Sequence, residues 1–281
     1  MKDDQLTPGR RVLLRAAAML VPAAIAGCAG TDRPAAPGPS ATGGAPAGGP
    51  QAARARKPSA YRLRPIAGSG PQRFTRALPH VRKAPILRMP DHDRSMVLTF
   101  DDGPDPRYTP AILRTLRRYD VRAMFFVCGE MAVENPDLLR EMADDGHLIG
   151  NHTWSHPLLT RLGRATMREE IERTCYVIEE VTGRPPAWFR APYGAWNRNA
   201  FQLGAQLGME PLAWTVDTLD WTEPGARTIA RRVRKGAGPG VVVLSHDAGG
   251  DRSGSVEALR DYLPQLLDSG YRITVPSSYL I

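Results

Sequence analysis

Short apolar runs alternate with helical patterns of hydrophobic positions throughout residues 96–281. Such alternation is typical of repeated βα units, which build a parallel sheet or barrel, so we expect an α/β fold class with a compact barrel of about seven strands. The predicted strands are Met96–Phe100, Ala123–Val127, Leu148–Asn151, Ala187–Arg190, Met209–Thr215, Val241–Ser245 and Tyr271–Val275. The predicted helices are Thr109–Tyr119, Asn135–Asp145, Thr166–Thr182, Asn197–Leu207, Ala226–Lys235 and Val256–Ser269.

The third predicted helix has the clearest pattern. Thr166 and Glu169 have the spacing of a capping box at its start, and Gly183 is a typical stop. Cys175 lies on the apolar stripe of this helix, and Cys128 follows an apolar run, so both are interpreted as small core residues with free thiols. Export from the cytoplasm would also permit a disulfide between them.

The amino terminus has the pattern of an export signal over residues 1–27. A charged start precedes an apolar stretch that is too short for a membrane-spanning helix. Ile25–Cys28 resembles a bacterial lipobox, which would place lipid on Cys28 and anchor the protein to the cell membrane, facing the cell envelope. Arg10 and Arg11 resemble the twin-arginine pattern. A plain secretory peptide that happens to contain a cysteine is the alternative.

Residues 28–60 are predicted to be a flexible linker, because Pro, Ala and Gly dominate them and offer little apolar surface to bury. Residues 61–95 are predicted to be a basic stem, which could be a short ordered segment or a strap across the barrel. The whole chain has a net charge of +8, which by itself would favour a nucleic-acid partner. However, residues 1–95 hold 16 basic and 5 acidic side chains, whereas residues 96–281 hold 21 and 24. The basicity therefore belongs to the leader and stem, and no nucleic-acid partner is expected.

Polar residues with catalytic or metal-binding chemistry follow five of the predicted strands. The carboxyl ends of parallel strands meet at one edge of a sheet, so these residues should lie close together. Two histidines four positions apart can hold one divalent ion, and an imidazole titrates near neutral pH as a general acid or base must. Each segment alone has an ordinary structural interpretation, but five together favour an active site. The residues are Asp101, Asp102, His152, His156, Arg190, Tyr193, Asp217, Asp220, Trp221, Leu244 and His246.

These segments resemble, in chain order, the five motifs of the polysaccharide deacetylase family, also called the NodB homology domain or carbohydrate esterase family 4. The resemblance covers residues 96–281 and implies a distorted (β/α) barrel with fewer than eight regular units. The five matching segments are Thr99–Gly103, His152–His156, Arg190–Gly194, Asp217–Trp221 and Leu244–His246.

The resemblance also implies a role for each residue. Asp102, His152 and His156 would bind a divalent metal, with Zn²⁺ as first choice and Co²⁺ or Mn²⁺ as alternatives. Asp101 would be the general base for a water that the metal activates, and His246 the general acid for the leaving amine. The supporting roles are Arg190 orienting Asp101, Asp220 or else Asp217 holding His246, the Tyr193 backbone N–H stabilising the oxyanion, and Trp221 and Leu244 lining the pocket.

The implied activity is removal of N-acetyl groups from N-acetylglucosamine-type residues of an extracellular polysaccharide, either peptidoglycan or a chitin-like glycan. The expected partners are this N-acetylated glycan and the membrane that holds the lipid anchor. Two alternatives stay open: an O-acetyl esterase that acts on xylan-type glycans with the same site, and a catalytically silent, tethered glycan-binding module.

Overall fold

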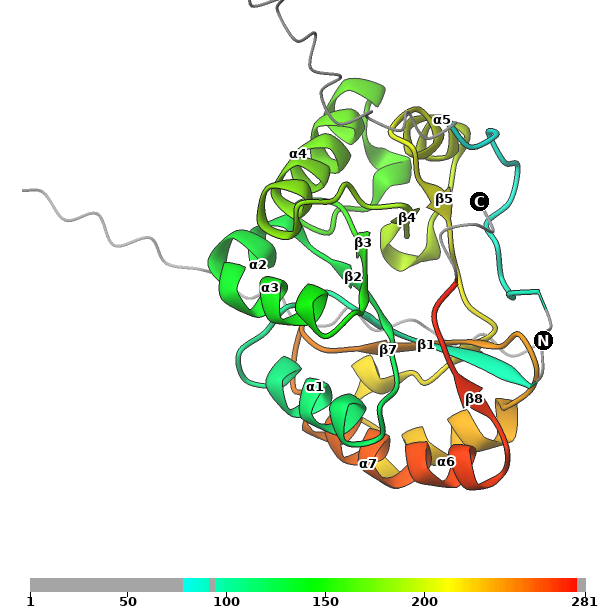
Figure 1. The fold of residues 1–281 in the computed structure, drawn as a ribbon. Helices are drawn as coiled ribbons and strands as arrows, with labels where there is room; N and C mark the ends of the chain where they lie inside the picture. Colours follow the sequence, from blue (N-terminus) through cyan, green and yellow to red (C-terminus); the bar gives the residue numbers. More distant parts are fainter. Residues whose placement is uncertain (1–77, 91–93, 277–281) are drawn as a thin grey trace, which may run out of the picture. The chain divides into compact units, whose positions relative to one another are not determined.

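Eight parallel strands organise the part of the chain that the computed structural model describes, residues 78–90 and 94–276 (Figure 1). Seven follow the order β5-β4-β3-β2-β1-β7-β6, and β8 pairs with β1 outside this path. Because β5 and β6 stand at opposite ends of this order, the sheet is a half-barrel, which confirms the predicted α/β class. The strands are β1 Ser95–Asp101, β2 Met124–Val127, β3 Leu148–Asn151, β4 Trp188–Phe189, β5 Glu210–Pro211, β6 Val216–Asp217, β7 Val242–His246 and β8 Arg272–Ile273.

Two groups of helices cover the outside of this sheet (Figure 1). One group contains α1 (Thr109–Arg118), α6 (Ala226–Gly236) and α7 (Ser253–Asp268). The other contains α2 (Gly129–Glu134), α3 (Pro136–Asp144), α4 (Arg164–Thr182) and α5 (Arg198–Gln206). Three short 3₁₀ turns lie between the strands and helices: η1 Leu159–Arg161, η2 Pro192–Gly194 and η3 Asp220–Thr222.

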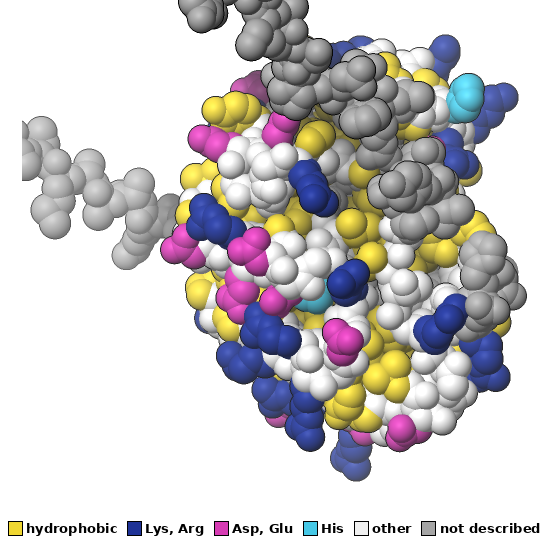
Figure 2. Space-filling view, viewed as in Figure 1, with side chains coloured by type: hydrophobic (Ala, Val, Ile, Leu, Met, Phe, Trp, Pro, Cys, Tyr) yellow, Lys and Arg dark blue, Asp and Glu magenta, His cyan; other side chains and the backbone are white. Residues whose placement is uncertain are grey.

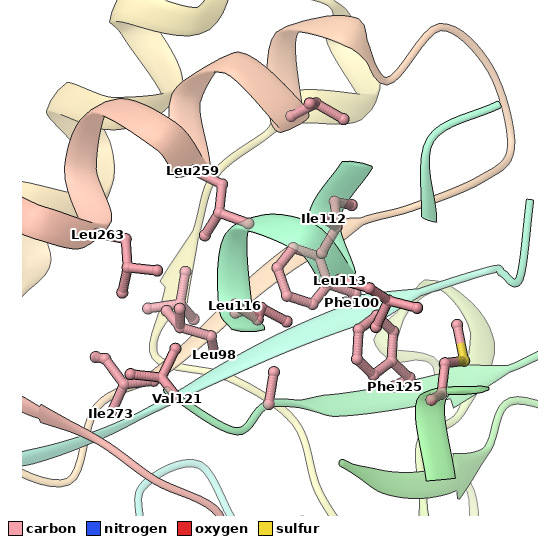
Figure 3. Packing of buried hydrophobic residues seen from close by; sticks show 14 of the residues in the cluster. Leu98, Phe100, Ile112, Leu113, Leu116, Val121, Phe125, Leu259, Leu263 and Ile273 are labelled. Atoms are coloured by element: carbon pink, nitrogen blue, oxygen red, sulfur yellow. The ribbon is translucent and has the colours of Figure 1, made fainter. Parts of the chain in front are cut away.

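Side chains of β1 alternate between two buried regions, as the period of a strand requires. Leu98 and Phe100 point outward and pack with Leu259 and Leu263 of α7 in the largest apolar cluster (Figure 3). Val97 belongs to a separate cluster of the barrel interior. Both faces of the strand are therefore buried, which explains its continuous apolar run.

Charged side chains of both signs lie on the outward faces of the helices (Figure 2). Arg117 of α1, for example, pairs with Glu141 of α3 at 2.8 Å and with Asp145 at 2.5 Å. These exposed pairs contribute little to stability, about 0–1 kcal/mol each. Burial of the apolar stripes beneath them is the larger contribution.

A strap formed by residues 82–89 crosses the open side of the half-barrel. It pairs with the chain after β5 and with the chain before β7, and its Arg82 forms a 2.5 Å ion pair with the buried Glu210. The basic stem was expected to be either a short ordered segment or a strap across the barrel, and its residues 82–89 form a strap. The backbone hydrogen bonds of the strap run from Ile86 N–H to Pro211 O (2.8 Å), from Ala213 N–H to Ile86 O (2.8 Å) and from Met89 N–H to Gly240 O (2.8 Å).

One predicted strand was wrong: the run Met209–Thr215 forms no single strand. The chain pairs with β4 at Glu210–Pro211, leaves the sheet, and pairs with β7 from Val216 onward. Between these strands the Leu212 and Ala213 carbonyls bind a buried arginine side chain instead of a neighbouring strand. A tertiary hydrogen bond therefore overrides the apolar pattern.

The helix predictions need three corrections. Helix α4 begins at Arg164 after Gly163 and has no side-chain cap, so the predicted capping box of Thr166 and Glu169 does not form; both lie inside the helix. Its stop at Gly183 is confirmed, with φ at 72°. Helix α2 was not predicted, and α7 begins at Ser253, ahead of the predicted start.

Cys128 is buried and Cys175 half-buried, and both are free thiols, as expected. The export signal of residues 1–27, the lipidation site Cys28 and the linker of residues 28–60 lie outside the described residues. In the described ranges, no helix has both the length and the apolar composition needed to cross a bilayer.

Candidate active site

A cavity of about 680 Å³ opens at the carboxyl ends of the strands and gathers most of the predicted site residues. Arg190 and Asp220 lie behind its wall, fully buried. Cys28 is the one predicted site residue outside the described part of the chain. The predicted residues that line the cavity are Asp101, Asp102, His152, His156, Tyr193, Asp217, Trp221, Leu244 and His246.

Asp102, His152 and His156 converge on one point, and their ligand atoms lie within 4.8 Å of one another. Asp102 Oδ1 is 3.5 Å from His152 Nε2 and 3.4 Å from His156 Nε2. The Nδ1 of His152 lies 2.8 Å from the Arg190 carbonyl oxygen, so it donates there and leaves Nε2 free to act as a ligand. Asp102 Oδ1 is buried with no hydrogen-bond partner in the described structure. A divalent cation fits this donor set, because it would satisfy that oxygen and both imidazoles together.

Two acidic or amide side chains hold the loop between the two histidines. Asn151 Oδ1 accepts the Thr153 N–H at 2.8 Å, and Glu170 accepts the Trp154 and Ser155 N–H groups at 3.0 and 2.9 Å. These bonds offset a backbone conformation that costs on the order of 1–3 kcal/mol per residue outside glycine. The non-glycine residues with positive φ around the cavity are Asp102 (78°), Thr153 (70°), His156 (57°) and Tyr193 (61°).

Asp101 is held by the buried Arg190, whose Nη1 donates to Asp101 Oδ1 at 2.6 Å. The other carboxylate oxygen, Oδ2, is 3.6 Å from His152 Nε2 and thus faces the candidate metal site. Burial raises the pKa of Asp101, while the Arg190 charge opposes that rise. The remaining acceptors of the Arg190 side chain are Thr99 Oγ1 (2.8 Å), Leu212 O (3.1 Å) and Ala213 O (3.0 Å).

His246 forms a buried pair with Asp220. Its Nδ1 is 2.7 Å from Asp220 Oδ1, and its backbone N–H donates to Asp220 Oδ2 at 2.8 Å. Burial lowers the pKa of His246, but the hydrogen bond and charge of Asp220 outweigh burial and raise it to about 9. Asp217 accepts the Leu219 N–H instead, at 2.8 Å. Of the two candidates, Asp220 is therefore the partner of His246.

Several functional-site residues were missed by sequence reasoning. Trp154 and Trp214 line the cavity; Trp154 lies within the matched segment His152–His156, and Trp214 lies within the predicted strand Met209–Thr215. Ser255 and Arg252 contact Asp220 from the start of α7, where no pattern in the sequence marks them. Thr99 lies within a matched segment, but its hydroxyl contact with Arg190 depends on tertiary structure.

This half-barrel carries an Asp-His-His group, a buried carboxylate and a paired histidine around one cavity. These features place the protein in the class of (β/α)-barrel hydrolases. A model of the polysaccharide deacetylase family matches residues 88–212. A peptidoglycan-N-acetylglucosamine deacetylase of Bacillus cereus is 38% identical over 192 residues, covering 68% of this chain and 70% of that protein. The chain belongs to the polysaccharide deacetylase family and is a deacetylase enzyme.

Two further comparisons show how far the similarity extends. The peptidoglycan-N-acetylglucosamine deacetylase PgdA of Listeria monocytogenes is 34% identical over 219 residues, covering 78% of this chain. That relative is longer, and the chain spans 45% of its length. A solved peptidoglycan N-acetylglucosamine deacetylase superimposes with a TM-score of 0.66 at 38% identity, covering 68% of this chain and 91% of the other.

Proposed function

We propose that this enzyme removes N-acetyl groups from N-acetylglucosamine-type residues of an extracellular polysaccharide, either peptidoglycan or a chitin-like glycan. The observation that carries the proposal is the unpartnered, buried Asp102 Oδ1, which faces two imidazole nitrogens beside the carboxylate of Asp101. The two relatives named above as peptidoglycan-N-acetylglucosamine deacetylases support this substrate class.

Asp102, His152 and His156 would hold the metal, with Zn²⁺ as first choice. When bound, such an ion polarises a carbonyl oxygen and lowers the pKa of a nearby water. The chain prepares this site, because burial lowers the pKa of His152 to about 3 and keeps its ring neutral, as a ligand must be.

Asp101 takes the proton of the attacking water. Arg190 occupies Asp101 Oδ1 and fixes the carboxylate, so Oδ2 faces the reaction centre as the proton acceptor. The water oxygen bonds to the acetyl carbon, and the backbone N–H of Tyr193 stabilises the resulting oxyanion.

His246 donates a proton to the leaving amine as the carbon–nitrogen bond breaks and acetate is released. Its raised pKa keeps the imidazole protonated at neutral pH. Because Nδ1 is engaged by Asp220, Nε2 is the nitrogen that carries the transferred proton.

Aromatic side chains make the cavity suitable for sugar rings. Tyr193 and Trp221 are exposed by 67% and 55%, and Trp154 and Trp214 also line the cavity. Flat aromatic rings pack against the apolar faces of sugars, and Leu244 offers an apolar contact for the acetyl methyl group.

Acetate release tests this function. The metal-loaded enzyme should release acetate from N-acetylglucosamine oligomers and peptidoglycan fragments, with mass loss of one acetyl group per event, and a chelator should abolish the reaction. Faster release from acetylated xylan would favour the O-acetyl esterase. Glycan binding without acetate release from any substrate would favour the catalytically silent module.

We also propose that the protein is exported and anchored through lipid on Cys28, with residues 28–60 as its linker. The lipobox-like sequence Ile25–Cys28 supports this location. Metabolic labelling with palmitate should mark the wild-type protein and not Cys28→Ala, which should also leave the membrane fraction. Equal membrane retention of both proteins would overturn the anchor.

A further inference from the structure

The N-cap residue and the first turn of α7 contact Asp220, the partner of His246, from two directions. Ser255 Oγ donates to Asp220 Oδ2 at 2.5 Å, and Arg252 Nη1 donates to the Asp220 backbone carbonyl at 3.1 Å. Both side chains are buried, with 4% and 3% of their surface exposed. Helix α7 thus supports Asp220 through its carboxylate and through its backbone.

The side-chain contact restricts how the Asp220 carboxylate can turn. Oδ2 accepts both Ser255 Oγ and the His246 backbone N–H, so Oδ1 is left for the His246 ring nitrogen at 2.7 Å. The two His246 contacts engage both oxygens, but both come from the residue that is to be positioned. The Ser255 hydroxyl adds a charge-assisted bond from a different element and restrains the carboxylate independently of His246.

The Arg252 contact fixes the backbone that carries Asp220. That turn, η3, is bounded by Leu219 and Glu223, both in the left-handed region with φ of 50° and 54°. Among the described residues, the Arg252 side chain has no carboxylate within ion-pair distance. A buried guanidinium without a carboxylate is costly, and here its hydrogen bonds join η3 to the loop after β7. Its other acceptors are Ala248 O (2.8 Å), Gly249 O (2.9 Å) and Asp251 O (3.2 Å).

We propose that Ser255 and Arg252 are positioning residues for the catalytic acid: they fix Asp220, and through it the ring of His246. The inference rests on the proposed function, in which His246 protonates the leaving amine. It adds the first turn of α7 to the parts of the fold on which that proton transfer depends.

The leaving group separates a positioning role from a general structural one. Cleavage of an N-acetyl amide releases an amine, which needs a proton from His246. Cleavage of 4-nitrophenyl acetate releases 4-nitrophenolate, a stable anion that leaves without a proton. Loss of the Ser255 hydroxyl should therefore slow amide cleavage and spare the ester. Damage to the metal site or to the fold would slow both reactions.

The experiment measures kcat and KM of the metal-loaded enzyme on an N-acetylglucosamine oligomer and on 4-nitrophenyl acetate. For Ser255→Ala and Arg252→Met we expect kcat on the oligomer to fall on the order of 10-fold, the scale of one charge-assisted hydrogen bond, with the ester rate unchanged. Ser255 does not line the cavity, so Ser255→Ala should also leave KM unchanged. Ser255→Thr keeps the hydroxyl and should restore the rate. Ser253→Ala and Arg260→Met, at exposed positions of the same helix, are the matched controls. Equal loss on both substrates, or no loss on the oligomer, would overturn the proposal.

A second measurement does not require turnover. The Nδ1–H proton of His246 should give a downfield signal in the NMR spectrum, because Asp220 protects it from exchange. That signal should broaden in Ser255→Ala and Arg252→Met and persist in the two controls. A signal that persists in all four variants would reject the positioning role. Loss of the signal in Ser255→Ala and Arg252→Met alone, together with a wild-type protein that has no amidase activity, would reject only the proposed function.

Discussion

Asp101 and Asp102 are adjacent in the chain, yet their side chains lie in different surroundings. Asp101, the last residue of β1, is fully buried against Arg190, whereas Asp102 has left-handed backbone and faces the two histidines. The turn between strand and loop therefore separates two like charges that would otherwise repel each other. One pair of identical residues acquires two different chemical environments.

Substitution of a proposed ligand and of the proposed acid should have different effects on metal content. His152→Ala should lose both metal and turnover, because it removes one of three ligands. His246→Ala should keep its metal and lose turnover by about 10²–10⁴-fold, the usual contribution of a general acid. Metal analysis by mass spectrometry with an acetate-release assay measures both effects. Full metal occupancy in His152→Ala would contradict the ligand assignment.

The His246–Asp220 pair should make the stability of the metal-free protein depend on pH. The folded pKa of His246 is about 9, above the value of 6.5 for a free side chain. The folded state therefore binds this proton more tightly, and its contribution is complete below pH 6.5 and disappears as the pH rises through 9. We expect wild type to lose about 2–3 kcal/mol relative to His246→Gln between these pH values. Denaturant unfolding at pH 6 and 9.5 measures this; parallel curves for both proteins would contradict it.

The residues that face the cavity could be predicted from sequence because they fall at strand ends and combine unusual residue types. Ser255 and Arg252 could not be predicted in this way. They are separated from Asp220 by 35 and 32 positions of the sequence, respectively, and both residue types are common on protein surfaces. Likewise the choice between Asp217 and Asp220 needed the backbone, which turns Asp217 onto Leu219.

At the scale of elements, the two ends of helix α7 contribute differently, one to the site and the other to the apolar core. Its first turn contacts Asp220, and its later turns bury Leu259, Leu263 and Leu266 in the main apolar cluster. Packing of the long stripe thus sets where the first turn lies. Periodicity predicted this stripe well, but it predicted α7 too short, because the polar residues of the first turn break the apolar pattern.

Leu259→Ala tests how much this packing contributes to stability. Leu259 is fully buried among β1 and α1 side chains, so truncation should cost about 2–5 kcal/mol of unfolding free energy. The exposed neighbour Arg260→Ala should change stability by less than about 0.5 kcal/mol. Both values come from denaturant unfolding of the purified proteins. A Leu259 variant as stable as wild type would show that the cluster tolerates the cavity.

The short elements mark the limit of sequence reasoning. Strands β5 and β6 have two residues each, and α2 has six, too few for a period to be distinguished from chance. Pairing with the strap and with Arg190 decides the path of Leu212 and Ala213, and neither contact is local in sequence.

At the scale of the whole molecule, the residues proposed to be catalytic depend on a segment upstream of the first strand. The strap binds the backbone on both sides of Leu212, and the Leu212 carbonyl in turn binds Arg190, which holds Asp101. The half-barrel is thus closed by chain that carries none of the five motifs. The geometry of the site therefore depends on this closure as well as on the residues that line the cavity.

Two truncations test the contribution of the strap. A chain that begins at residue 78 should keep the stability and activity of the full chain, because it keeps the strap and all of the half-barrel. A chain that begins at residue 91 loses the strap, including the ion pair of Arg82 with Glu210, and should unfold at lower denaturant and release acetate more slowly. Thermal unfolding and acetate release measure both. Indistinguishable proteins would show that the strap is dispensable.

The strap also bears on the order in which the molecule can assemble. A chain made from its amino terminus produces the strap before its partners, which lie 128 residues further on for Arg82 and 151 for Arg88. Contacts of such long sequence separation form late, because the intervening chain must first be ordered. We therefore expect closure of the half-barrel to be a late step of folding, and a nascent chain that stops before Val241 lacks the backbone that pairs with Arg88.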